Sequence, residues 1–130
     1  ILESLPRMPP LVVVAVRPPV GLSTAAVFRA CQVSSRPKSV QELVEAIGRD
    51  DVRQVGRLLH NGLQEAASSL SPWIGRLQRE FQRSGVLGHA MSGSGSTYFA
   101  LCHTVGQARR LAGRLRQQCC GAVFWGVTGR

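Results

Sequence analysis

The sequence predicts an α+β fold in which helices pack on one face of a four-stranded antiparallel sheet. Four runs of β-branched, aromatic and other apolar residues, at 11–16, 86–91, 97–102 and 122–127, are typical of strands. Apolar residues recur at helical spacing between them, so the elements follow in the order β, a block of helices, β, β, α, β. The closing ββαβ portion is half of a ferredoxin-like plan, so we expect a ferredoxin-like domain.

The first predicted strand is continuous and rich in valine, as in strands that are buried on both faces. It stops at 17–19, where an arginine precedes two prolines. A short loop then leads to Ser23 and Thr24, either of which could cap the helix that follows them. Because helix N-termini present free amides, the same two residues could also bind an anion.

The block of helices begins with a capping box that opens a helix over 39–48, after a loop at 34–38. Apolar residues keep helical spacing over 52–70, across Asn61-Gly62, which predicts one long helix with a kink or break at that pair. A serine-proline pair starts a further helix over 71–85. A second capping box, at 104–107, opens the helix that precedes the last strand.

The chain is strongly basic, with 16 basic and 7 acidic residues and a net charge of +9. Such a balance suggests nucleic acid, a membrane surface or a phosphorylated ligand as partner. The arginines are scattered except for a denser run at 109–116, and aromatic residues are not interleaved with them as in a base-stacking platform. Solvated helix faces therefore explain most of them better than nucleic acid does. The apolar run at 11–16 is too short to span a membrane, and no signal peptide is recognisable, so we expect no membrane partner.

The cysteines and histidines predict neither a disulfide nor a metal site. The four cysteines have no CxxC spacing, and the vicinal pair Cys119-Cys120 is an improbable structural disulfide. Reduced thiols are the simpler interpretation, which places the protein in the cytoplasm. The three histidines are far apart and match no zinc-binding pattern.

The most informative stretch is the run of small residues at 92–96, which connects the second and third predicted strands. Its two glycines can take positive φ and let the backbone approach a ligand closely. Successive amides in such a turn form a concavity that binds anions. The stretch is neither a Walker loop, which ends in lysine and serine or threonine, nor a Rossmann turn, which opens a helix. Spacing alone leaves a phosphate site and a flexible serine-glycine turn equally open.

Several stretches resemble the GHMP kinases, the superfamily of galactokinase and of homoserine, mevalonate and phosphomevalonate kinases. MSGSGSTYFAL, with the helix before it, resembles their third motif. LVVVAVRPP followed by GLSTAAVF is similar to the opening of the C-terminal domain in the 4-diphosphocytidyl-2-C-methyl-D-erythritol kinase branch. HNGLQEAA resembles the Asn-x-Leu-Glu helix of that branch, with Gln64 where an acid is more usual, and the closing FWGV also fits.

The resemblance implies a domain organisation. GHMP kinases bind ATP through a Pro-x-x-x-Gly-Leu-Gly-Ser-Ser loop and use an aspartate base with a lysine, all in an N-terminal domain, and none of these occurs here. Residues 1–10, with three prolines, are then a linker from a missing N-terminal ATP-binding domain, and 11–130 are the C-terminal substrate-binding domain. That other domain would be the partner of this one and would bind most of the ATP and Mg²⁺. We expect the isolated chain to be inactive and to self-associate through the apolar face it exposes.

The resemblance also implies roles for individual residues. The loop residues would hold the phosphate groups of a small-molecule substrate: Ser92, Gly93, Ser94, Gly95 and Ser96. No catalytic residue and no metal ligand is expected within this chain.

At the start of the first helix, Ser23 would be a further substrate-binding residue, Thr24 would line the methylerythritol pocket and Phe28 would stack on the cytosine ring. The simpler alternatives are that Thr24 is only an N-cap and Phe28 only a core residue. Asn61 is expected to be a helix break rather than a ligand.

The function implied is ATP-dependent phosphorylation of the 2-hydroxyl of 4-diphosphocytidyl-2-C-methyl-D-erythritol, in non-mevalonate isoprenoid precursor synthesis. One alternative is another GHMP branch, such as homoserine or phosphomevalonate kinase. A second is a non-enzymatic, basic ferredoxin-like module that binds nucleic acid or an acidic protein through its arginines.

Overall fold

The computed structural model describes residues 4, 7–33, 39–118 and 120–129. The expected loop at 34–38, five residues of the expected linker (1–3 and 5–6) and Cys119 of the vicinal pair lie outside this part.

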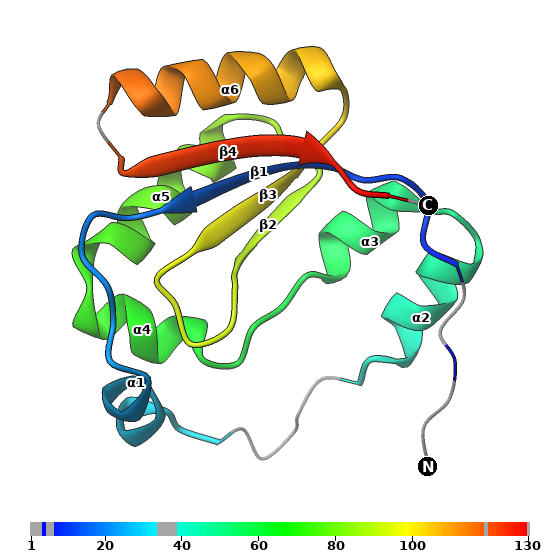
Figure 1. Cartoon of the computed structure of the whole chain (residues 1–130). Coiled ribbons are helices and arrows are strands. Elements are labelled where there is room, and N and C mark those ends of the chain that lie inside the picture. The colour runs from blue at the N-terminus through cyan, green and yellow to red at the C-terminus, as the bar shows by residue number, and fades with distance from the viewer. Residues whose placement is uncertain (1–3, 5–6, 34–38, 119, 130) are drawn as a thin grey trace.

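The sheet has four antiparallel strands, in the spatial order β2-β3-β1-β4 (Figure 1). The strands are β1 (Val12–Arg17), β2 (Gly88–Met91), β3 (Tyr98–Cys102) and β4 (Ala122–Val127). The predicted α+β class with a four-stranded antiparallel sheet is confirmed. The strand β1 is central and hydrogen-bonded on both sides, which fits its continuous valine-rich sequence.

The six helices of the described part are α1 (Thr24–Ala30), α2 (Gln41–Gly48), α3 (Val52–Leu58), α4 (Gln64–Leu70), α5 (Pro72–Arg83) and α6 (Val105–Gln117). The helical stretch predicted over 52–70, with a kink or a break at Asn61-Gly62, is broken there. It forms two separate helices, α3 and α4, with Asn61 between them. Half of the capping box predicted at 104–107 is formed: the Thr104 hydroxyl accepts a hydrogen bond from the Gln107 amide at 3.0 Å, whereas Gln107 Oε1 accepts from the amide of His103 at 2.7 Å instead of that of Thr104.

The main core lies between one face of the sheet and the helices α5 and α6. Val14 and Val16 of β1 are fully buried there, together with Tyr98 of β3. The Tyr98 ring stacks on Phe81 of α5 with centroids 5.6 Å apart. The alternation of buried residues along the strand follows from the two-residue period of side chains in a sheet.

A second, smaller core lies on the opposite face, where α2 and α3 pack beneath the sheet. It consists of Leu11, Ala46, Ile47, Val55 and Leu101 with partly buried neighbours. The helices are therefore not confined to one face. The pair α2 and α3 was expected with the other helices, but its apolar stripes meet the face of β3 that carries Leu101.

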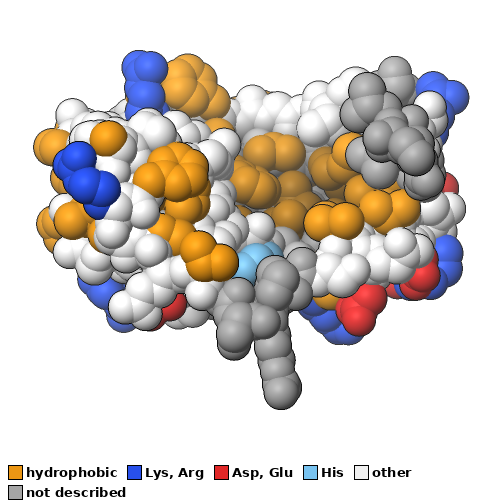
Figure 2. Space-filling model, turned by 90° about the horizontal axis from the view of Figure 1, so that it is seen from below, with side chains coloured by type: hydrophobic (Ala, Val, Ile, Leu, Met, Phe, Trp, Pro, Cys, Tyr) orange, Lys and Arg blue, Asp and Glu red, His pale blue; other side chains and the backbone are white. Residues whose placement is uncertain are grey.

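The rest of this second face is open. Seen from below, the molecule is hollowed across its middle and hydrophobic side chains line the hollow (Figure 2). A pocket of about 300 Å³ on β1 and β4 is lined by Val13, Ala15, Phe124, Trp125, Gly126, Val127 and Thr128. None of the helices in the described ranges is long and apolar enough to cross a lipid bilayer.

Candidate functional site

The loop between β2 and β3 forms a tight, glycine-dependent tip. The Ser92 amide donates to the Thr97 carbonyl at 2.8 Å, and the Gly95 amide donates to the Ser92 carbonyl at 3.1 Å. Gly93 has φ of 58° and Gly95 has φ of 94°, in the region that favours glycine. The prediction that these glycines take positive φ is confirmed.

Exposure differs along this loop. Ser92 and Gly93 are exposed, and Ser94 and Gly95 are half-buried. Ser96 is buried, with 7% of its surface exposed, so its side chain belongs to the base of the loop rather than to its outer surface. Four of the five predicted loop residues therefore present accessible atoms.

The N-terminus of α1 meets the loop. The hydroxyl oxygens of Thr24 and Ser94 lie 3.0 Å apart, within hydrogen-bond distance, although 70 positions separate them in the sequence. Ser23 is the N-cap, since its Oγ accepts a hydrogen bond from the Ala26 amide at 3.3 Å. The interpretation of Thr24 as a simple N-cap is therefore wrong, and its side chain is turned to the loop.

Phe28 is exposed, with 59% of its surface accessible, whereas the preceding residue, Val27, is fully buried. The core position of α1 is thus occupied by Val27, and the alternative that Phe28 is a core residue is wrong. An exposed phenylalanine one turn after Thr24 leaves a free aromatic face near the hydroxyl pair.

Two residues that contact the loop were not assigned to the site from sequence. Asn61 Nδ2 donates to the carbonyls of Met91 at 2.8 Å and Gly93 at 2.7 Å. Gln64 Oε1 accepts from the Met91 amide at 3.0 Å. The sequence signal at this place is an Asn-Gly pair that interrupts an apolar helical pattern. This signal correctly predicted a helix break, but it did not predict that Asn61 binds the loop carbonyls.

Gln64 also begins a partly buried chain of hydrogen bonds that continues to Tyr98 and His89. Because its Oε1 accepts from a backbone amide, its Nε2 must be the atom that donates to Tyr98 Oη at 3.1 Å. The Tyr98 hydroxyl also lies 2.8 Å from Nδ1 of His89, and it donates its hydrogen there when the neutral imidazole carries its proton on Nε2. Burial raises the pKa of Tyr98 to about 12 and lowers the pKa of His89, which keeps both groups uncharged near neutral pH.

Comparison with known proteins decides the family. The model of the C-terminal domain of GHMP kinases matches residues 43–120. The chain belongs to this family.

Similar proteins share this assignment. The 4-diphosphocytidyl-2-C-methyl-D-erythritol kinase of Pelotomaculum thermopropionicum is 36% identical over 118 residues, covering 89% of this chain and 41% of that protein. The kinase of the same name from Shouchella clausii is 32% identical over 120 residues, covering 92% and 40%. This GHMP kinase domain thus spans about 40% of the length of these curated relatives.

Solved structures agree with the sequence comparison. The crystal structure of a 4-(cytidine 5'-diphospho)-2C-methyl-D-erythritol kinase superposes with a TM-score of 0.79 at 28% identity, over 98% of this chain and 46% of that one. A homoserine kinase from Cytophaga hutchinsonii has a TM-score of 0.75 at 20% identity, over 98% of this chain and 44% of that one. The latter likeness establishes the shared fold alone.

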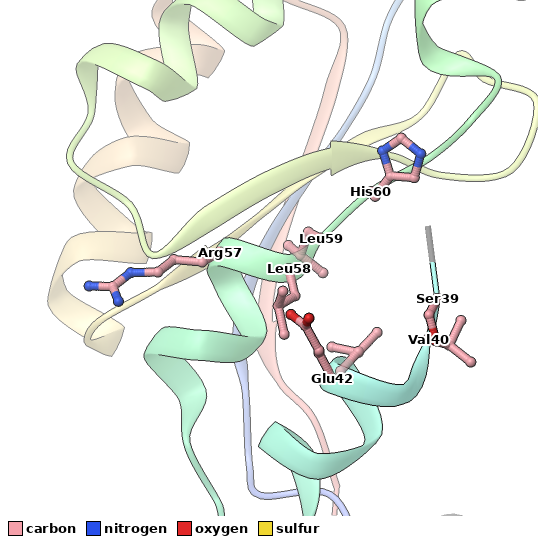
Figure 3. Close-up of a pocket in the computed structure, with 8 residues that line it drawn as sticks. Ser39, Val40, Glu42, Arg57, Leu58, Leu59 and His60 are labelled. Carbon is pink, nitrogen blue, oxygen red and sulfur yellow. The ribbon is translucent and has the colours of Figure 1, made fainter. Parts of the chain in front are cut away.

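A separate pocket of the GHMP kinase domain, of about 460 Å³, lies between α2 and α3 (Figure 3). Its lining comprises Ser39, Val40, Glu42, Leu43, Arg57, Leu58, Leu59 and His60. The side chain of Arg57 points away from Glu42 in this view, so the two do not form a charged pair across the pocket. None of the predicted ligand residues lines it.

The neutral state of His89 predicts a pH dependence of stability. Its folded pKa lies below the ordinary value of 6.5, so between these two values the unfolded chain binds the proton and the folded chain does not. The contribution of His89 is complete above pH 6.5 and declines as the pH falls through that interval. We expect the melting temperature to fall more between about pH 7.5 and about pH 5.5 in the wild type than in His89→Asn, whose amide oxygen can still accept from Tyr98. An equal fall in melting temperature in the two proteins would show that the surroundings of His89 do not keep it neutral.

Proposed function

We propose that this chain is the substrate-binding domain of a longer kinase that transfers a phosphoryl group from ATP to the 2-hydroxyl of 4-diphosphocytidyl-2-C-methyl-D-erythritol. The observation that carries the proposal is the 3.0 Å contact between Thr24 Oγ1 and Ser94 Oγ. It joins the α1 terminus to the glycine loop, and these are the two segments from which a substrate site would be built. The relatives that share 32–36% identity over most of this chain carry the name of that kinase.

The hydroxyl pair has the hydrogen-bonding capacity that a polyol phosphate needs. One of the two hydroxyl hydrogens is used between Thr24 and Ser94, which leaves the other free to donate to a ligand oxygen. The remaining lone pairs can accept from a sugar hydroxyl. Beside them, the amides of Gly93 and Ser94 have no acceptor within the described part of the chain and can donate to a phosphate.

Phosphoryl transfer depends mainly on positioning and charge stabilisation. Within the described residues, no three or more carboxylate, imidazole or thiol groups are placed together to hold a metal ion. We assign ATP, Mg²⁺ and the catalytic base to an N-terminal domain that precedes the linker at 1–10. This chain would orient the substrate and exclude water around its phosphates.

The open face of the sheet is a candidate contact for that N-terminal domain. Phe124 is 58% exposed and lies on β4 beside the apolar pocket of this face. Exposed apolar patches of this kind mark interaction sites, so the isolated chain would tend to self-associate there. The full-length enzyme that we propose is cytoplasmic and acts on a small, phosphorylated substrate.

Phe28 offers the sharpest test of the substrate. Removing an aromatic stack on a base costs roughly 1–3 kcal/mol, and about 1.4 kcal/mol is tenfold in affinity. Phe28→Leu in the full-length kinase should therefore weaken binding of 4-diphosphocytidyl-2-C-methyl-D-erythritol about tenfold, with ATP affinity unchanged. Isothermal titration of each ligand against the folded variant measures both values.

Val105→Ala is the control, because Val105 is also an exposed apolar residue, with 39% of its surface accessible, but lies on α6, away from the glycine loop and from the open face of the sheet. It should leave both affinities at wild-type values. An unchanged substrate affinity in Phe28→Leu would remove Phe28 from the site and with it the cytosine assignment.

A further inference from the structure

The glycine loop is held from behind by two side-chain amides, Asn61 and Gln64, which we call the amide clamp. Asn61 holds the Met91 and Gly93 carbonyls, and Gln64 holds the Met91 amide. Both residues come from the junction between α3 and α4, about 30 positions before the loop. The start of the loop is therefore fixed by contacts that lie outside the hairpin itself.

Both polar atoms of the Asn61 side-chain amide are hydrogen-bonded in this arrangement. Its two Nδ2 hydrogens go to the two loop carbonyls, at 2.8 and 2.7 Å. Its Oδ1 accepts from the Leu63 amide at 2.9 Å, which fixes the side chain to the start of α4. No other natural side chain of this size offers two donors and one acceptor in the same positions.

Holding the Gly93 carbonyl sets the direction of the next amide. In a trans peptide the C=O and N–H groups point in opposite directions, so the Ser94 amide points away from Asn61. The Ser92 and Gly95 amides are bonded inside the turn, whereas that of Ser94 has no acceptor within the described residues. The Ser94 hydroxyl, on the same residue, meets Thr24.

We propose that Asn61 is a positioning residue that aims the Ser94 amide at a phosphate group of the substrate by holding the Gly93 carbonyl. This inference rests on the proposed function, because the oriented amide needs a phosphorylated ligand. Asn61 does not touch the ligand and acts only through the loop.

The test uses Asn61→Ser in the full-length protein, since a serine hydroxyl can still accept from the Leu63 amide but has a single hydrogen and cannot donate to both loop carbonyls. Thr104→Ala is the matched control: it removes a helix-capping hydroxyl of α6 that makes no contact with the loop. Amide hydrogen exchange, which requires no substrate, is measured first. Exchange at the Ser92 and Gly95 amides should accelerate roughly tenfold in Asn61→Ser and not in Thr104→Ala, because at least one of the two hydrogen bonds from Asn61 to the loop is lost.

Steady-state kinetics are measured next, on the same proteins. A loop displaced by about 1 Å can cost up to about a hundredfold in rate, so kcat of Asn61→Ser should fall roughly 10- to 100-fold. KM for ATP should be unchanged, and kcat of Thr104→Ala should match the wild type even if its melting temperature falls equally. A purely structural role would instead lower activity only in proportion to the unfolded fraction.

The two readings separate the possible failures. Unchanged exchange at Ser92 and Gly95 overturns the inference whatever the activity. Faster exchange with normal kcat per folded molecule overturns the catalytic part of it. If the wild type does not phosphorylate 4-diphosphocytidyl-2-C-methyl-D-erythritol, the proposed function fails, and titration with inorganic pyrophosphate then decides the matter: Asn61→Ser must bind it more weakly than Thr104→Ala, and equal binding overturns the inference.

Discussion

Gly88→Ala is expected to lower the free energy of unfolding by about 3 kcal/mol, at the upper end of the usual cost of overpacking. A Cβ on Gly88 would overlap the carbonyl of Gly56 and lie 2.7 Å from its Cα. Both partners are backbone, so neither can move aside as a flexible side chain would. Urea unfolding followed by circular dichroism measures the difference.

The matched control is Gly113→Ala on α6, where an added Cβ meets nothing within 4 Å. There alanine should raise stability by about 0.5–1 kcal/mol, through its higher helix propensity. If Gly88→Ala unfolds at the same urea concentration as the wild type, α3 does not lie directly on β2. The contact matters beyond stability because α3 leads into Asn61, and its position therefore sets that of the amide clamp.

Gly95→Ala in the full-length protein is expected to reduce kcat for the proposed reaction roughly 10- to 100-fold, since the loop must move to accept the side chain. Gly95 has φ of 94°, and an added Cβ would lie 2.9 Å from Cδ1 of Leu22 and 3.0 Å from Sδ of Met91. Both are ends of flexible side chains, so stability should fall by only about 1–3 kcal/mol, mostly from the backbone conformation. Activity per folded molecule and melting temperature are measured on the same sample.

Gly85→Ala provides the comparison, because Gly85 has φ of 66° and open space around its Cα but lies at the end of α5. It should lose similar stability and keep normal turnover. Should Gly95→Ala melt far below the wild type yet keep normal activity per folded molecule, the loop would be only a turn.

The sheet could be predicted from sequence because its signals are local. Each strand is a short apolar run with clear ends, and β1, β3 and β4 begin within one residue of the expected positions. The placement of α2 and α3 on the second face could not be predicted in this way. Their apolar stripes specify that one side is buried but not which face of the sheet buries it.

Within the site, the loop and α1 were found from residue type, whereas Asn61 was not. Its partners, the carbonyls of Met91 and Gly93, are backbone groups, and any sequence supplies these. Nothing in the residues at 91–93 therefore indicates that an asparagine 30 positions earlier will bind there. Similarly, Ser23 and Thr24 both carry hydroxyls, and only the extended backbone at Ser23 decides which one caps α1.

The acceptor substrate tests the account most directly. The full-length protein is incubated with ATP and Mg²⁺ and, separately, with 4-diphosphocytidyl-2-C-methyl-D-erythritol, homoserine or phosphomevalonate, and phosphorylated product is measured by ³¹P NMR. The isolated chain of residues 1–130 is run beside it. We predict product from the diphosphocytidyl substrate alone, and none from the isolated chain. Turnover of homoserine or phosphomevalonate in its place, or product from the isolated chain above a protein-free control, would contradict the account.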